Sequence, residues 1–262
     1  MHRKVTSWSE FKESWAGQRN FLVGGECIPF SFPFPEPAKV VEEMRADAQA
    51  RISPGVKGDR LRLDDMSAEF RRLPIGEALE RPFALAHFKL SVFDEPGKFL
   101  HGFRDAVLEP WRQALRDQGF SFDRCYPIIF ISGKGCATNY HMDYSHVLAW
   151  QATGMKRFCG LLDPDHWAPR ETRLSYSPDR FSRPPSLGEA DELCYDMAPG
   201  DALWNALLTP HWVEAGDEVA ISVNISHGGL RLDGKLCPFE EELEQHRREH
   251  PETVPKKLSS TY

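Results

Sequence analysis

Apolar residues at helical spacing occur mainly in the first half of the chain and near its end. Trp8, Phe11 and Trp15 lie three and four positions apart, which places them on one face of a helix. The same kind of spacing predicts four further helices, over residues 37–50, 67–80, 100–118 and 238–250. We expect the helices to pack outside the core, because each has one apolar and one charged face.

Alternating or continuously apolar runs predict strands from residue 83 onward. They cover residues 83–93, 126–132, 147–153, 155–162, 193–204 and 218–225. In the first of these, His87 and Lys89 share one face and are candidates for a pocket wall, although a strand histidine is more often structural. The strands are short, and strand and helix do not alternate along the chain. This order favours a mainly β or α+β chain over a doubly wound parallel sheet.

Two segments interrupt the regular pattern. Residues 51–66 form a basic stretch that we expect to be a surface loop, with a lid over an anionic substrate as the alternative reading. Its basic residues are Arg51, Lys57, Arg60 and Arg62. Residues 163–191 are rich in proline, arginine and serine, and we expect an irregular insertion. This insertion is a candidate for gripping the substrate, with Tyr176, Arg180 and Arg183 as possible contacts.

Composition and charge describe an ordinary globular protein. The 262 residues are 41% hydrophobic and 27% charged, which is enough for one domain with a substantial core. A net charge of −7 gives no overall attraction to nucleic acid, so we expect no nucleic-acid partner. No apolar run is long enough for a membrane span and residues 1–6 lack a secretory pattern, so we expect a cytoplasmic monomer or homodimer without membrane contact.

The six cysteines are scattered and show no CxxC spacing. Their spacing argues against a zinc knuckle and against a thioredoxin-type motif. Cys136, Cys159 and Cys194 lie in apolar or strand-like surroundings, and we expect them to be small core residues. We therefore expect no disulfide.

A His-x-Asp pair, His141 and Asp143, carries the most specific chemistry in the sequence. Alternate residues of an extended segment point the same way, so the two side chains can bind one metal ion. His211, 70 residues after His141, supplies the third ligand of a 2-His-1-carboxylate facial triad. The carboxylate favours Fe(II) or Mn(II) over a closed thiolate zinc site. His146 is not expected to be a ligand, because position i+5 points to the opposite face of a regular strand.

Further motifs surround this triad in a fixed order. Thr138 lies three residues before His141 and Lys156 lies 15 residues after it, while the turn 198–204 precedes His211 and the strand 219–224 follows it. This combination resembles the JmjC/cupin-type Fe(II)- and 2-oxoglutarate-dependent dioxygenases, and is similar to the asparaginyl hydroxylase that acts on hypoxia-inducible factor. The likeness covers residues 121–232. The sequence departs from the family in the loop 205–210 and at Val147, which bears on the substrate pocket.

The resemblance implies a fold and a site. The fold is a double-stranded β-helix, a jelly roll of the cupin and JmjC type, mainly β with flanking helices. It would occupy residues 83–235 as the catalytic core, with helical and extended segments over 1–82 packing on it and a C-terminal helix and tail over 236–262. By resemblance, the catalytic iron ligands are His141, Asp143 and His211, and the residues that bind 2-oxoglutarate are Lys156, Thr138 and Asn224.

The activity that the resemblance implies is hydroxylation of an unactivated C–H bond by Fe(II), 2-oxoglutarate and O₂, with succinate and CO₂ as co-products. Desaturation and ring formation are variants of the same chemistry. We expect a small metabolite or an amino-acid-like substrate, with a peptide or protein side chain as the alternative. Two other classes remain open: a metal-cupin enzyme that does not use 2-oxoglutarate, and a non-catalytic cupin binding module.

Overall fold

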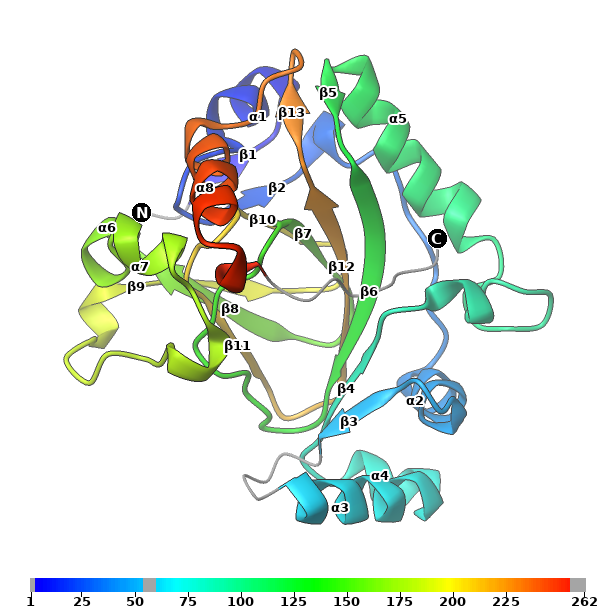
Figure 1. Ribbon diagram of the computed structural model, residues 1–262. Helices are drawn as coiled ribbons and strands as arrows, with labels where there is room; N and C mark the ends of the chain where they lie inside the picture. The colour runs from blue at the N-terminus through cyan, green and yellow to red at the C-terminus, as the bar shows by residue number, and fades with distance from the viewer. Residues whose placement is uncertain (1–2, 54–59, 255–262) are drawn as a thin grey trace.

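The computed structural model describes residues 3–53 and 60–254 (Figure 1), and most of its strands belong to one sheet of eight. Along the sheet the order is β1 (Lys4–Val5), β2 (Phe21–Val23), β10 (Ala202–Asn205), β7 (His146–Thr153), β12 (Ala220–Gly228), β6 (Arg124–Ser132), β4 (Ala84–His87) and β3 (Arg51–Ser53). β1 and β2 are parallel, and the other neighbours are antiparallel. The N-terminal strands therefore extend the same sheet that carries the central strands β7, β12 and β6.

A second sheet faces the first. Its three strands, in order, are β11 (Trp212–Ala215), β8 (Lys156–Leu161) and β9 (Glu192–Met197). Ala149 on β7 and Leu203 on β10 share one buried cluster with Phe158 on β8 and Tyr195 on β9. Two antiparallel layers packed through such side chains form the double-stranded β-helix that we expected.

Helices cover the outer face of the large sheet. The predicted stripe of α1 (Trp8–Ser14) is buried, with Phe11 in edge-to-face contact with Trp204 of β10. Ser7 begins this helix with a capping box to Glu10. α5 runs along the outer side of β6 (Figure 1), and its Trp111 is fully buried. The other elements of the N-terminal half are η1 (Gly25–Cys27), α2 (Pro37–Ala46), α3 (Arg60–Arg72), α4 (Ile75–Leu79), η2 (Leu90–Phe93), η3 (Arg104–Leu108), α5 (Glu109–Asp117) and β5 (Phe120–Ser121).

The C-terminal helix α8 (Pro238–Glu249) packs on the core through Phe239 and Leu243, which are both buried. It stands at one end of the two sheets (Figure 1). The remaining elements are α6 (Pro164–Trp167), α7 (Arg170–Leu174), η4 (Pro178–Arg180), η5 (Glu189–Asp191), β13 (Arg231–Leu232), which pairs with β5, and η6 (Pro251–Thr253). Within the described ranges, no helix combines the length and the apolar character needed to cross a bilayer.

Several predicted elements were wrong in extent. The strand expected over 193–204 is two strands, β9 and β10, that belong to different sheets. The helix expected over 37–50 ends at Ala46, and the helix expected over 100–118 begins at Arg104 as η3 and continues as α5.

The strand expected over 83–93 ends at His87, because the His87 ring accepts a hydrogen bond from the Lys89 backbone (3.2 Å) and the chain turns into η2. The helix expected over 67–80 is divided at Pro74 into α3 and α4, since proline cannot continue a helix from the preceding turn. The loop expected over 51–66 contains β3 and the start of α3, while Lys57 lies outside the described residues.

The expectation of no disulfide was also wrong. Cys159 on β8 and Cys194 on β9 are direct cross-strand partners and form a disulfide, with their Cα atoms 4.0 Å apart. The pairing depends on the register between two strands that are 35 residues apart in sequence, which spacing rules along the chain do not reveal. Cys136 is a free buried cysteine, as expected.

Candidate metal centre and its cavity

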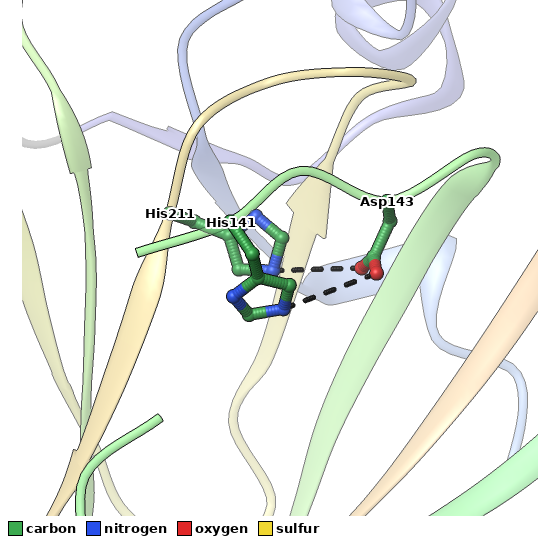
Figure 2. A group of neighbouring side chains, drawn as sticks. All are labelled: His141, Asp143 and His211. Carbon is green, nitrogen blue, oxygen red and sulfur yellow. Dashed lines mark ion pairs between the residues drawn. The ribbon is translucent and has the colours of Figure 1, made fainter. Parts of the chain in front are cut away.

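The three predicted metal ligands converge on one point (Figure 2). His211 Nε2 lies 3.5 Å from Asp143 Oδ2, and His141 Nε2 lies 4.0 Å from Asp143 Oδ1. Two cis ligands on an octahedral ion are about 3 Å apart when each bond is about 2.1 Å. The observed separations are slightly longer, so small side-chain movements would bring all three groups into coordination range.

The backbone, rather than a regular strand, holds these ligands in place. His141 and His211 form an isolated antiparallel bridge, with N–H to carbonyl distances of 3.0 and 2.9 Å in the two directions. Asp143 follows two residues later in the segment before β7, and its carbonyl accepts the Leu208 N–H (2.9 Å). Met142, between the two ligands, is buried on the other side. The alternation that we expected of a strand is therefore present, although the segment is a loop with single bridges.

Hydrogen bonds select the tautomer that metal binding needs. Nδ1 of His141 lies 2.6 Å from the Asn139 carbonyl, and Nδ1 of His211 lies 3.0 Å from the Thr209 carbonyl. A carbonyl only accepts, so each Nδ1 carries the proton and each Nε2 presents its lone pair to the shared point. Burial, reinforced by the charge of His141, lowers the pKa of His211 to about 4, which keeps this ring neutral. The donor set therefore fits a divalent ion of the Fe(II) type.

The loop 205–210, where the sequence departs from the resembling family, holds the third ligand. In this loop the Thr209 carbonyl accepts a hydrogen bond from His211 Nδ1, and the Leu208 N–H donates a hydrogen bond to the Asp143 carbonyl. Leu208 adopts a φ of 50°, a left-handed conformation that is uncommon for a leucine. The loop that departs from the family motif therefore contacts two of the three predicted ligands.

Lys156 is the most unusual charged residue of the site. It is 4% exposed, and its Nζ donates to the Phe130 carbonyl (3.0 Å) and to Ser222 Oγ (2.9 Å). No described carboxylate forms an ion pair with it, and burial lowers its pKa to about 7. An ammonium group buried in this way is costly unless an anion joins it, so its position suits an anionic ligand.

The remaining two predicted residues flank the same space. Thr138 Oγ1 accepts the Val213 N–H (2.8 Å), which leaves the hydroxyl proton as a donor. Asn224 lies two residues after Ser222 on β12, and its buried Oδ1 has no hydrogen-bond partner in the described structure. All six predicted site residues, including the three metal ligands, line one cavity of about 680 Å³.

The insertion 163–191 contacts residues 142–144, which include the predicted ligand Asp143. None of the described residues of the insertion lines this cavity. The Tyr176 hydroxyl accepts the Met142 N–H (3.2 Å), and the Tyr176 carbonyl accepts the Tyr144 hydroxyl (3.0 Å). Arg183 pairs with Glu192 (2.5 Å) and lies 4.6 Å from the Trp212 ring, and Arg180 is exposed. The insertion therefore positions Met142 and Tyr144, which flank Asp143.

Two other histidines prove to be structural. The His87 ring is fully buried and bonds to Asp47 (3.1 Å). His146 lies on the helix-covered side of the sheet, where it stacks on Trp204, as expected for a residue outside the triad. His146 Nδ1 accepts the Leu207 N–H, so its Nε2 carries the proton and faces Glu240 at 3.5 Å. In that tautomer Nε2 carries a proton in place of a lone pair, so it cannot bind a metal.

The cavity also includes side chains that the sequence reasoning did not single out. Arg124 and Tyr126 line it from β6, and Arg247 lines it from α8. Arg124 and Tyr126 alternate with buried residues toward Phe130, so the period of two along β6 was a usable signal. Arg247 lies on a charged helix and gave no such signal.

Comparison with solved structures finds the fold of this chain in YcfD from Escherichia coli. One YcfD structure aligns with 97% of this chain and 60% of its own chain, at 17% identity and a TM-score of 0.54. Another, a YcfD ribosomal oxygenase in complex with cobalt and 2-oxoglutarate, aligns with 99% of this chain and 63% of its own, at 16% identity and a TM-score of 0.52. A third holds cobalt and succinic acid, with 15% identity, coverages of 99% and 60% and a TM-score of 0.51.

These matches show the fold. The chain has the fold of these YcfD structures, in keeping with the double-stranded β-helix that the motif resemblance implied. It spans less than two thirds of the length of these YcfD chains. No protein-family model and no curated protein matched the sequence in these comparisons. The particular likeness to the asparaginyl hydroxylase acting on hypoxia-inducible factor stays a prediction.

Proposed function

We propose that this chain is an Fe(II)- and 2-oxoglutarate-dependent oxygenase. The observation that carries the proposal is that two histidines and a carboxylate meet in one cavity with a buried lysine that forms no ion pair with any described carboxylate. The YcfD neighbours solved with cobalt and 2-oxoglutarate or succinic acid support it. A metal-cupin enzyme without 2-oxoglutarate, or a pure binding module, would have no need of the buried Lys156.

Each residue of the candidate site has a proposed role. His141, Asp143 and His211 would hold the metal through two Nε2 atoms and one carboxylate. Lys156 and Thr138 bind the distal carboxylate of 2-oxoglutarate, and the amide of Asn224 orients it. Fe(II) with 2-oxoglutarate and O₂ supplies the oxidant that hydroxylates an unactivated C–H bond. The apolar wall, with Ile128 and Phe130, excludes water from the reacting centre.

The neighbours named ribosomal oxygenases favour the peptide or protein side chain as the acceptor, so we propose this class in place of the small metabolite that we first expected. The acceptor class is tested separately below from the oxygenase activity itself.

The test of oxygenase activity is succinate formation from 2-oxoglutarate by Fe(II)-loaded protein under air. We expect the wild type to form succinate slowly without an acceptor. His141→Ala should lower this rate by more than about 100-fold, because loss of a metal ligand costs more than loss of a residue that only hydrogen-bonds to a ligand. His101→Ala, at an exposed histidine outside the cavity, is the matched control and should retain wild-type turnover. Absence of turnover together with absence of 2-oxoglutarate binding to the metal-loaded wild type would contradict the proposal.

A further inference from the structure

The cavity continues beyond the metal ligands to an end lined by arginine. Arg124 begins β6, and Arg247 projects from α8. Along β6, Arg124, Tyr126, Ile128 and Phe130 line the cavity at every second position. This wall of the cavity therefore follows the length of the strand.

Lys156 and Arg124 stand at opposite ends of that wall. Lys156 donates to the carbonyl of Phe130, which is six residues from Arg124, and six residues of strand span about 20 Å. The neighbouring strand β12 shows the same separation. Ser222, the other partner of Lys156, is paired with Phe130, and Gly228 is paired with Arg124. A 2-oxoglutarate molecule held by Lys156 is too short to reach Arg124.

The metal ligands lie between these two ends. Ser145, two residues after Asp143, bonds to Ser226 of β12 through the two hydroxyl groups (2.7 Å). Ser226 is four residues from Ser222 and two from Gly228, or about 13 and 7 Å along the strand. The space between the metal and the arginines is therefore the part of the cavity that remains for an acceptor once the co-substrate is bound.

The two arginines have no anionic partner in the described structure. Neither forms an ion pair within 4.0 Å, and Nη2 of Arg247 is buried without any hydrogen-bond partner. The Arg247 guanidinium lies 5.7 Å from the ring of Tyr144, next to Asp143. Burial is the main cause that lowers the pKa of Arg247, and the charge of Arg124 adds to it, while Glu240 and Glu244 oppose the shift. The two guanidinium groups thus repel each other across the cavity end.

The charges of the residues that line the cavity also indicate an anionic ligand. Among the described lining residues Asp143 is the one acidic side chain, and Arg51, Arg124, Lys156 and Arg247 are basic. A divalent metal and Lys156 together offset Asp143 and the two carboxylates of 2-oxoglutarate. Arg124, which is exposed, and Arg247, which is half-buried, form no ion pair in the described structure, and Glu240 and Glu244 act on Arg247 only at longer range. A low-dielectric cavity lined by one sign of charge attracts a ligand of the other sign.

We propose that the acceptor of this enzyme carries a carboxylate and that Arg124 and Arg247 bind it while the reacting C–H bond faces the metal. The inference rests on the proposed function and narrows its substrate class. Planar guanidinium groups match a carboxylate with two parallel hydrogen bonds. The carboxylate can come from an acidic side chain in a peptide or from a free amino acid.

Calorimetric titration of Mn(II)-loaded protein saturated with 2-oxoglutarate tests this without requiring turnover. The probes are two matched acid and amide pairs in which the main-chain carboxyl is blocked as an amide: N-acetylglutamate α-amide with N-acetylglutamine α-amide, and an end-blocked Ala-Ala-Glu-Ala-Ala peptide with its Gln counterpart. We expect at least one acid to bind about tenfold or more tightly than its amide. Preference in the peptide pair alone assigns the carboxylate to a peptide, and preference in the N-acetyl pair assigns it to a free amino acid.

The arginine variants decide whether the preference comes from this end of the cavity. Arg124→Gln and Arg247→Gln should each weaken acid binding about fivefold or more and leave amide binding unchanged, and Arg247→Lys should restore part of the loss. Arg157→Gln, at an exposed arginine on β8 outside the cavity, is the matched control. Equal binding of acid and amide by the wild type, or an acid preference that survives both glutamine variants, would overturn the proposal. Either result leaves the succinate assay, and with it the oxygenase proposal, unaffected.

Discussion

At the scale of single residues, Lys156 links the structure to a measurable pH dependence. Its two hydrogen bonds go to a carbonyl and a hydroxyl, so nothing offsets the positive charge, and burial lowers its pKa to about 7. A bound carboxylate would stabilise the ammonium form and raise this pKa. Binding of 2-oxoglutarate is therefore coupled to protonation of Lys156.

The affinity for 2-oxoglutarate should therefore depend on pH in one direction. Below pH 7 the lysine is already charged, and affinity for 2-oxoglutarate should be nearly constant. Above pH 7 the protein must take up a proton on binding, so affinity should fall by up to about tenfold per pH unit. Calorimetry of the Mn(II)-loaded protein at pH 8.5, in buffers of different ionisation enthalpy, should report uptake of close to one proton.

An arginine variant is the control for this prediction. In Lys156→Arg the guanidinium stays charged throughout the range, so any binding that the variant retains should be independent of pH between 7 and 9. His211, whose pKa is about 4, does not titrate in this range. Uptake of no proton by the wild type at pH 8.5 would show that Lys156 is not the carboxylate partner.

Residue spacing was enough to predict the candidate site but not the arginine-lined end of its cavity. His141 and Asp143 are two apart, and Lys156 and Thr138 keep fixed distances from them, so local sequence carried these assignments. Arg247 reaches the cavity from a helix about 100 residues after Asp143, and only the packing of α8 brings it there. The tautomers of His141 and His211 depend on carbonyls only two residues away, Asn139 and Thr209, but their orientation follows from the backbone conformation, which residue spacing does not give.

At the scale of secondary elements, hydrophobic periodicity predicted most helices and strands. It did not predict the contacts that end a strand or link two of them. The stripe of Trp8, Phe11 and Trp15 was buried as expected, because a helix repeats every 3.6 residues whatever it packs against. The strand after residue 83 was overextended, because it ends where the His87 ring accepts a hydrogen bond from the Lys89 N–H, and periodicity does not report such bonds. The disulfide between β8 and β9 is likewise a property of register, not of either strand alone.

This disulfide predicts a dependence of stability on reductant. It closes a segment of 35 residues that includes α6, α7 and Tyr176, and such a loop lowers unfolded-state entropy by an amount worth about 2–4 kcal/mol at 25 °C. Addition of a phosphine reductant should lower the free energy of unfolding in urea by this amount. The double variant Cys159→Ser/Cys194→Ser should unfold like the reduced wild type and ignore the reductant. Superimposable wild-type curves with and without reductant would refute the linkage.

At the scale of the whole molecule, the metal centre joins segments that are far apart in the fold. His141 and Asp143 lie between β6 and β7 of the large sheet, whereas His211 directly precedes β11 of the small sheet. Lys156 begins β8 of the small sheet and contacts Phe130 and Ser222 of the large one. Metal and co-substrate should therefore bind only where both sheets are in native register, and each should stabilise the folded chain.

Thermal melting can separate the two contributions. A ligand that binds only the native state adds about 2.7 kcal/mol at 100 times its dissociation constant, or about 5–10 °C for a chain of this size. Mn(II) should raise the melting temperature of the wild type by this amount, and 2-oxoglutarate should raise it further. His141→Ala should respond to neither. Lys156→Met should respond to Mn(II) but not to 2-oxoglutarate, and should itself melt no lower than the wild type, because it removes a buried unpaired charge. A 2-oxoglutarate shift that persists in Lys156→Met would place the co-substrate elsewhere in the cavity.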